Sequence, residues 1–97
     1  MIHSFRDKWL ADFYWNDESS KKVPADIEGA LFRRLNMLQA ATCDRDLRSP
    51  PSNHFEQMKG NLAGKCSIRV NKKWRLVFAF DGSTGQATDV YLDPHTY

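Results

Sequence analysis

Cysteine is scarce in this 97-residue chain, and long apolar runs are missing from it. The two cysteines, Cys43 and Cys66, are too few for the disulfide framework of a small secreted domain, so we expect two free thiols. No apolar run reaches the length of a membrane span, and the first residues lack the apolar core of a signal peptide. We therefore expect a cytosolic protein that does not associate with membranes.

Histidine is also rare, and His3, His54 and His95 are scattered without the close spacing of a metal site. We therefore expect neither a metal ion nor another cofactor. The length suits one domain over residues 1–97. The hydrophobic fraction of 41% and the aromatic fraction of 12% are enough for a packed core and argue against a disordered chain.

Acidic residues are absent from residues 57–80, although the whole chain carries a net charge of only +2. A block of one sign inside a folded region predicts a positive surface, for which phosphate is the usual partner. A solvated basic face that merely aids solubility is the competing interpretation, and charge alone does not decide between the two. The basic residues of this acid-free stretch are Lys59, Lys65, Arg69, Lys72, Lys73 and Arg75.

The first half of the chain contains helical periodicity. Residues 1–5 alternate between apolar and polar and predict a short strand. Apolar residues then recur every three or four positions over residues 8–15 and about 25–41, which predicts two helices. The polar residues 16–22 between them predict a loop.

The second half switches to a period of two. Adjacent prolines at Pro50 and Pro51 predict an extended crossing segment over residues 44–53. Strands are then predicted at about residues 54–59, 65–70, 74–80 and 87–92. The order strand, helix, helix and four strands predicts an α+β fold, with a mostly antiparallel sheet and both helices on one face.

The register of one hairpin follows from its apolar residues. A three-residue loop over residues 71–73 places Val70 opposite Trp74, so that the alternating apolar residues of both strands share one face of the sheet. A two-residue loop would place Val70 opposite Arg75 and expose half of the apolar residues of each strand. In the favoured register Arg69 lies directly opposite Arg75, on the face away from the helices. Like charges placed side by side favour a bound anion, although two arginines that splay into water are the alternative.

The last residues offer a titratable group. His95 follows Asp93 closely at the end of the last predicted strand, and an ordinary imidazole changes charge near neutral pH, as proton transfer requires. His54 is a second acid–base candidate or simply a strand-edge residue.

Three motifs in the second half of the chain carry a family resemblance. They are Asp46-Leu47-Arg48-Ser49-Pro50-Pro51-Ser52-Asn53, Lys59-Gly60-Asn61-Leu62-Ala63-Gly64 and Ser67-Ile68-Arg69-Val70-Asn71-Lys72-Lys73-Trp74-Arg75. Together they resemble the HigB type of the RelE/ParE toxin superfamily, the toxins of bacterial type II toxin–antitoxin systems. Residues 1–5 and 34–41 also look like that family, so the resemblance covers nearly the whole chain apart from the loop near residues 16–23.

The resemblance implies a RelE-like α+β fold and an endoribonuclease, an mRNA interferase that cleaves translated messenger RNA in the ribosomal decoding site without a metal. In that reaction the RNA's 2′-hydroxyl attacks the adjacent phosphorus and the 5′-oxygen leaves. The chemistry needs a base, an acid and cations near the phosphoryl oxygens.

Several residues match the family's functional positions. The resemblance implies phosphate and transition-state stabilisation by Arg75, phosphate binding or proton transfer by Lys59, and acid–base catalysis by His95 with Asp93 orienting it. Glu56 stands where some members carry a histidine, so either Glu56 or nearby His54 is the candidate base. Further RNA contacts are expected from Arg69, Lys72, Lys73, Lys65, Tyr91 and Tyr97.

The end of the chain departs from the family's pattern. Members often end in Asp-Tyr-His, whereas this chain has Pro94 between Asp93 and His95. Proline cannot stack or donate a proton, so Tyr91 or Tyr97 replaces the tyrosine ring, or the step proceeds without it. This departure supports an alternative function, a non-catalytic RNA- or ribosome-binding module with the same basic face.

The resemblance also implies partners: a helix-turn-helix antitoxin of the HigA type, the ribosome and its messenger RNA, and operator DNA only through the antitoxin complex. Most of the aromatic residues at 9, 13, 14 and 15 are expected in the core, with one or two left for the antitoxin. A DNA-binding domain is disfavoured because no recognition helix carries the basic cluster.

Overall fold

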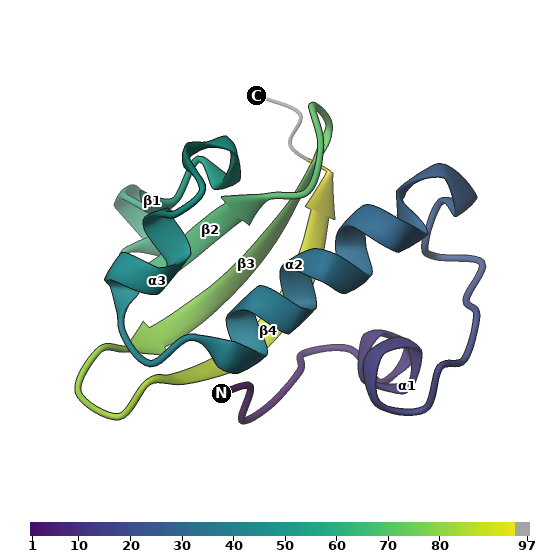
Figure 1. Cartoon of the computed structure of the whole chain (residues 1–97), viewed down its shortest axis with the longest axis horizontal. Helices are drawn as coiled ribbons and strands as arrows, with labels where there is room; N and C mark the ends of the chain where they lie inside the picture. The colour runs from purple at the N-terminus through teal and green to yellow at the C-terminus, as the bar shows by residue number, and fades with distance from the viewer. Residues whose placement is uncertain (95–97) are drawn as a thin grey trace.

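A four-stranded antiparallel sheet, with helices on one of its faces, forms the structure of this chain, a computed structural model that describes residues 1–94 (Figure 1). The strand order in the sheet follows the chain, and the strands are β1 Glu56–Gln57, β2 Lys65–Arg69, β3 Trp74–Asp81 and β4 Gln86–Pro94. The α-helices are α1 Lys8–Trp15, α2 Glu28–Ala40 and α3 Asp44–Arg48. Short 3-10 turns lie at Ala25–Ile27, Pro51–Asn53 and Gly60–Leu62.

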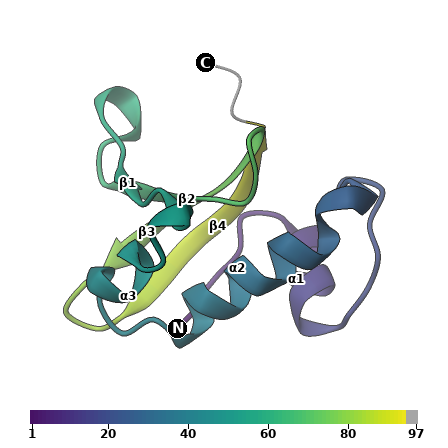
Figure 2. The same ribbon diagram turned by 45° about the horizontal axis from the view of Figure 1, so that its top comes forward.

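The α+β class, the antiparallel sheet and the two long helices predicted from the sequence are confirmed. Helix α2 crosses one face of the sheet and α1 lies beside it, as Figures 1 and 2 both show. The core between α2 and the sheet is fully apolar, because Leu31, Leu35 and Leu38 of α2 meet alternate residues of the strands. Those strand residues are Ile68, Leu76, Phe78, Val90 and Leu92. No helix among residues 1–94 is long and apolar enough to cross a membrane.

Helix α3 corrects the prediction that residues 44–53 are extended throughout. Asp46, in the first turn of α3, accepts hydrogen bonds from the backbone nitrogen and hydroxyl of Thr42, at 2.9 and 3.1 Å. These bonds close the start of the helix and hold the pKa of Asp46 below its usual value. Leu47 is fully buried, so one turn of helix forms before the prolines end it.

The first strand of the sheet is shorter than predicted. The sequence predicted a strand over residues 54–59, whereas β1 contains only Glu56–Gln57. His54 has a φ of 45°, in the left-handed region, and this turns the chain before the strand begins.

The N-terminal segment is not the regular strand that its alternating pattern predicted. It runs parallel to β4 through two isolated bridges, Ile2 to Ala87 and Phe5 to Val90. Between those bridges Asp89 has a φ of 56°, and the β3–β4 register shifts at Val77 and Ala79. This bulge in β4 interrupts the ladder, because the Asp89 backbone nitrogen donates to the Ser4 hydroxyl instead of a carbonyl.

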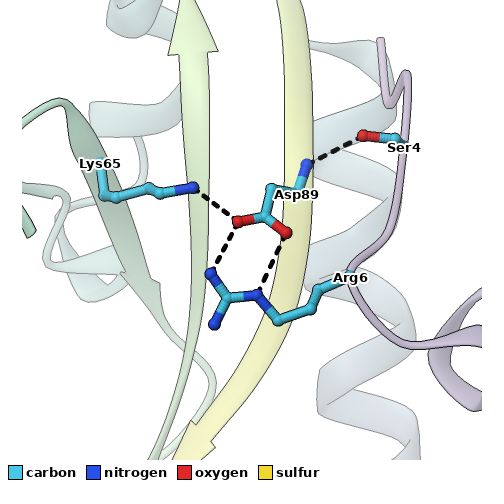
Figure 3. Close-up of polar contacts among 4 residues, drawn as sticks. All are labelled: Ser4, Arg6, Lys65 and Asp89. Atoms are coloured by element: carbon cyan, nitrogen blue, oxygen red, sulfur yellow. Dashed lines mark hydrogen bonds and ion pairs between the residues drawn. The ribbon is translucent and has the colours of Figure 1, made fainter.

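The Asp89 carboxylate joins the N-terminal segment to the sheet (Figure 3). Nε and Nη2 of Arg6 donate to its two oxygens at 3.1 and 2.7 Å, and Nζ of Lys65 donates at 2.7 Å. These two cations hold the pKa of Asp89 well below its usual range. The bulge thus gives a carboxylate two partners from β2 and from the start of the chain.

We predict that the ionised Asp89 carboxylate makes the free energy of unfolding depend on pH in the acidic range. A carboxylate with a depressed folded pKa stabilises the fold above its usual value of 3.8 and loses that contribution as the pH falls further. Asp89→Asn, which tolerates the left-handed backbone, should lower the urea midpoint at pH 7. The difference in urea midpoint between Asp89→Asn and the wild type should become smaller as the pH falls from about 4 towards 2.

Asp17→Asn is the matched control, because Asp17 also has a left-handed φ, 54°, and forms no ion pair within the described chain. Its urea midpoint should follow that of the wild type at every pH. If the difference in urea midpoint between Asp89→Asn and the wild type stays constant from pH 7 to pH 2, this role of the carboxylate is contradicted.

Candidate functional site

Polar side chains gather on the sheet face that carries no helix in the described part of the chain. Arg69 of β2, Arg75 of β3 and Asp93 of β4 occupy one row across the three strands. The three-residue hairpin loop that set this register is confirmed, with the Val70 nitrogen donating to the Trp74 carbonyl at 2.9 Å. The predicted pairing of Arg69 with Arg75 is confirmed with it.

Arg75 is buried, with only 3% of its surface exposed. Its Nη2 donates to the His54 carbonyl at 2.9 Å, and its Nη1 lies 3.6 Å from an oxygen of the Glu56 carboxylate. Asp93 lies directly opposite it on β4. The Glu56 carboxylate, from outside the acid-free stretch, therefore balances the buried charge of Arg75.

Two polar atoms on this face are buried without a hydrogen-bond partner in the described chain. They are Nε of Arg75 and the hydroxyl oxygen of Ser67. Ser67 pairs with Glu56 on one side and Val77 on the other, so it lies diagonal to Arg75 on the same face. Both groups can donate a hydrogen bond, and buried donors without acceptors are rare in folded proteins. The pair is therefore suited to an oxyanion.

The loop before β1 holds His54 in place beside these groups. The buried side-chain amide of Asn53 donates to the carbonyls of Leu47 and Ser49, at 3.1 and 3.4 Å. This fixes the turn in which the His54 carbonyl meets Arg75. The His54 ring is exposed, and its Nε2 lies 3.4 Å from Nη1 of Arg69.

The remaining predicted residues fall into separate groups. A hollow of about 410 Å³ along β1 is lined by Glu56, Gln57, Met58 and Lys59, which brings exposed Lys59 beside the Glu56 partner of Arg75. Lys72 and Lys73 are exposed on the hairpin loop, and the Lys73 ammonium lies 5.7 Å from the centre of the Trp74 ring. His95 and Tyr97 lie outside the described residues.

Lys65 and Tyr91 are already engaged within the protein. Lys65 binds Asp89, and the guanidinium of Arg6 lies 3.8 Å from the centre of the Tyr91 ring. Tyr91 therefore has one ring face covered, which the sequence did not reveal. Within residues 1–94, no three side chains of His, Cys, Asp or Glu come close enough together to hold a metal ion.

Sequence reasoning missed Ser67, Asn53 and Arg6. Ser67 had a usable signal, because it shares the strand parity of Arg69 and so the same face. Asn53 acts through backbone carbonyls only four and six residues earlier, in a loop without regular periodicity. Arg6 acts through Asp89, which lies 83 residues away in the sequence, so no local pattern indicates that contact.

Solved structures of toxins share this architecture. The YoeB–YefM toxin–antitoxin complex of Staphylococcus aureus matches with a TM-score of 0.57 and 19% identity, covering 100% of this chain and 94% of that one. The toxin–antitoxin complex RelBE2 of Mycobacterium tuberculosis matches with a TM-score of 0.52 and 17% identity, covering 96% and 94%. At these identities the likeness shows a shared fold.

Sequence comparison is more specific. Toxin HigB-1 of Vibrio cholerae serotype O1 is 52% identical over 97 residues, which is 100% of both chains. A protein of Haemophilus influenzae is 39% identical over 93 residues, 96% of this chain and 90% of the relative. A family model described as the RelE-like toxin HigB of type II toxin–antitoxin systems matches residues 3–95. The chain therefore belongs to the HigB-like family of RelE-like toxins of type II toxin–antitoxin systems.

Proposed function

We propose that this toxin is an endoribonuclease that cleaves translated messenger RNA on the ribosome and thereby stops growth. The observation that carries the proposal is the buried Arg75 guanidinium, whose Nε has no partner among residues 1–94 and which lies beside exposed His54 and Glu56. A site of this kind offers a fixed cation to a phosphate and acid–base groups to its neighbours. Such an enzyme acts in the cytosol, where translated messages are found.

The reaction uses the RNA's own 2′-hydroxyl as the nucleophile, so it needs no metal-bound water. A base removes the hydroxyl proton, and the bond from the 2′-oxygen to phosphorus forms. The bond from phosphorus to the 5′-oxygen breaks, and an acid protonates the leaving oxygen. Negative charge gathers on the phosphoryl oxygens, which is where a preorganised guanidinium stabilises the transition state.

Arg75 is the residue that we assign to this charge. Its position is set before substrate arrives, because the His54 carbonyl and the Glu56 carboxylate already hold two of its nitrogens. Nε is buried and has no partner in the described chain, and it would meet a phosphoryl oxygen once the side chains that cover it move aside. Lys59 and Arg69 supply further positive charge near the phosphate, and Lys72 and Lys73 contact the RNA backbone.

We assign the base to His54 and the acid to His95. Glu56 balances the buried charge of Arg75, whereas the exposed His54 ring contacts only one charged group in the described structure, Arg69. His95 follows Pro94 directly in the sequence and matches the family's C-terminal histidine. Asp93, opposite Arg75 on the last strand, is the carboxylate that orients the acid.

An antitoxin encoded beside the toxin is the proposed partner, as in the complexes of YoeB with YefM and of RelBE2. Helices α1 and α2 present an aromatic patch in which Trp15 is 52% and Phe32 39% exposed. Tyr14 packs between them, with ring centroids 4.7 Å from Trp15 and 5.4 Å from Phe32. Large exposed aromatic side chains are typical of protein interfaces. We place the antitoxin on this aromatic patch.

Arg75→Lys tests the proposed ribonuclease. Lysine keeps the charge but loses the planar fork and Nε, so cleavage should fall about a hundredfold. The measurement is the rate of message cleavage on translating ribosomes, together with growth after induction. Arg33→Lys, an exposed change on α2, is the control and should cleave like the wild type.

Intact messages in cells that make the free wild-type toxin would rule out the ribonuclease. Tight binding of message or ribosome without cleavage would instead identify the non-catalytic binding module that Pro94 suggests.

His54→Gly separates the two contributions of His54. Glycine keeps the backbone carbonyl that binds Arg75 and adopts a φ of 45° without strain, so the urea midpoint should stay at or above that of wild type. Loss of the imidazole should slow cleavage about a hundredfold. His54→Val provides the structural control, because a β-branched residue in the left-handed region should be destabilised by about 1–3 kcal/mol. Full activity of His54→Gly would transfer the base role to Glu56.

Trp15→Ser combined with Phe32→Ser tests the antitoxin surface. Interface aromatics dominate binding energy, so affinity for the neighbour-encoded antitoxin should fall about tenfold or more by calorimetry. The free variant should stay toxic. Lys21→Ser, in the exposed loop before α2, is the control. Unchanged affinity of the double variant would place the antitoxin elsewhere.

A further inference from the structure

Arg6 holds its guanidinium flat against an aromatic ring beside the site. The central carbon of the guanidinium lies 3.8 Å from the centre of the Tyr91 ring. Two of its nitrogens, Nε and Nη2, are bound edge-on to the Asp89 carboxylate, as Figure 3 shows. Stacking on one side and two hydrogen bonds along one edge fix the plane of the group.

The outer face of this guanidinium is open. The Arg6 side chain is 46% exposed, although Tyr91 covers one face and Asp89 one edge. These two contacts leave the other face of the guanidinium and its Nη1 end uncovered. Asp89 takes two of the five N–H donors of Arg6, so both the open flat face and the Nη1 end remain for a ligand.

The Arg6 platform, defined as Arg6 with Tyr91 and Asp89, borders the proposed cleavage site. Tyr91 and Asp93 lie two residues apart on β4, on the same face and about 7 Å from each other. Asp93 is opposite Arg75, so Tyr91 of the platform stands two residues along β4 from the row that we assign to the scissile phosphate. One nucleotide bridges a span of that size.

The charge around the platform also suits RNA. Arg6 and Lys65 share the single carboxylate of Asp89, which leaves one net positive charge at the sheet surface. This charge attracts a phosphate backbone, while the flat face suits an unstacked base, since bases of single-stranded RNA stack on arginine planes.

We propose that the Arg6 platform binds one unpaired base of the message by stacking, next to the phosphate that is cleaved. The proposal rests on the proposed ribonuclease function and adds a base-binding subsite to it. Asp89 and Tyr91 act as positioning residues, since they orient Arg6 and leave the base contact to its guanidinium.

The test combines a change in the protein with a change in the RNA. Arg6→Lys keeps the charge and a partner for Asp89 but removes the planar group. The messages carry an abasic nucleotide at one position at a time in and around the decoding-site codon. Single-turnover cleavage rates on programmed ribosomes are measured for each combination, and urea midpoints confirm that the variant is folded.

Arg6→Lys should cleave the unmodified message roughly tenfold more slowly than wild type, the scale of one stacked base. At one position of the message, the abasic nucleotide should lower the cleavage rate of the wild type by a similar factor. The same nucleotide should leave the cleavage rate of Arg6→Lys unchanged. This loss of sensitivity at a single nucleotide is a readout that a purely structural role of Arg6 would not produce. Lys8→Ala, whose ion pair with Asp12 lies on the surface of α1, is the control and should behave like wild type on every message.

Two outcomes would overturn the proposal in different ways. If Arg6→Lys cleaves at the wild-type rate, or responds to every abasic position as the wild type does, the platform is wrong and the ribonuclease stands. If the wild type cleaves no message, the ribonuclease is wrong, and the platform falls with its substrate.

Discussion

A buried guanidinium, that of Arg75, is the group on which the polar face of this toxin depends. A charge with 3% exposure is stable only when its partners are held at fixed positions. Its partners come from the left-handed turn at His54 and from β1, neither of which is adjacent to β3 in the sequence. The burial of one side chain therefore constrains the turn, the first strand and the hairpin register together.

Much of the fold was predictable from hydrophobic periodicity. Helix α1 begins and ends at the predicted residues, and the predicted helix over residues 25–41 is a 3-10 turn followed by α2. The hairpin register followed from the parity of its apolar residues because a one-residue slip would expose the core. Helix α3 was missed because five residues show no helical period, and its start is closed by a hydrogen bond that the Thr42 backbone nitrogen donates to the Asp46 carboxylate. The prediction of a regular N-terminal strand was wrong because a bulge at Asp89 interrupts the partner strand, β4.

The sequence predicted which residues belong to the candidate site better than it predicted the contacts among them. Strand parity placed Arg69 opposite Arg75, but the same parity could not report that Glu56 and the His54 carbonyl balance Arg75. Those contacts join residues about twenty positions apart. Arg6 is the extreme case, since its ring and carboxylate partners are more than eighty positions away, across a parallel contact that has no sequence signal.

The distribution of these partners changes how the acid-free stretch should be understood. In the sequence it is a continuous positive block, which predicts a broad attraction for phosphate. In the fold, carboxylates from outside the block form ion pairs with Arg75 and Lys65. The fixed positions of these two cations therefore matter more than their share of the positive potential around the protein. Lys59, Arg69, Lys72 and Lys73 have no carboxylate partner within residues 1–94 and carry the remaining long-range attraction. Recognition on such a face combines a few unpaired charges at its rim with fixed groups at its centre. Fixed groups are what a phosphoryl transition state requires, because an ion that is already oriented does not have to reorganise when charge develops.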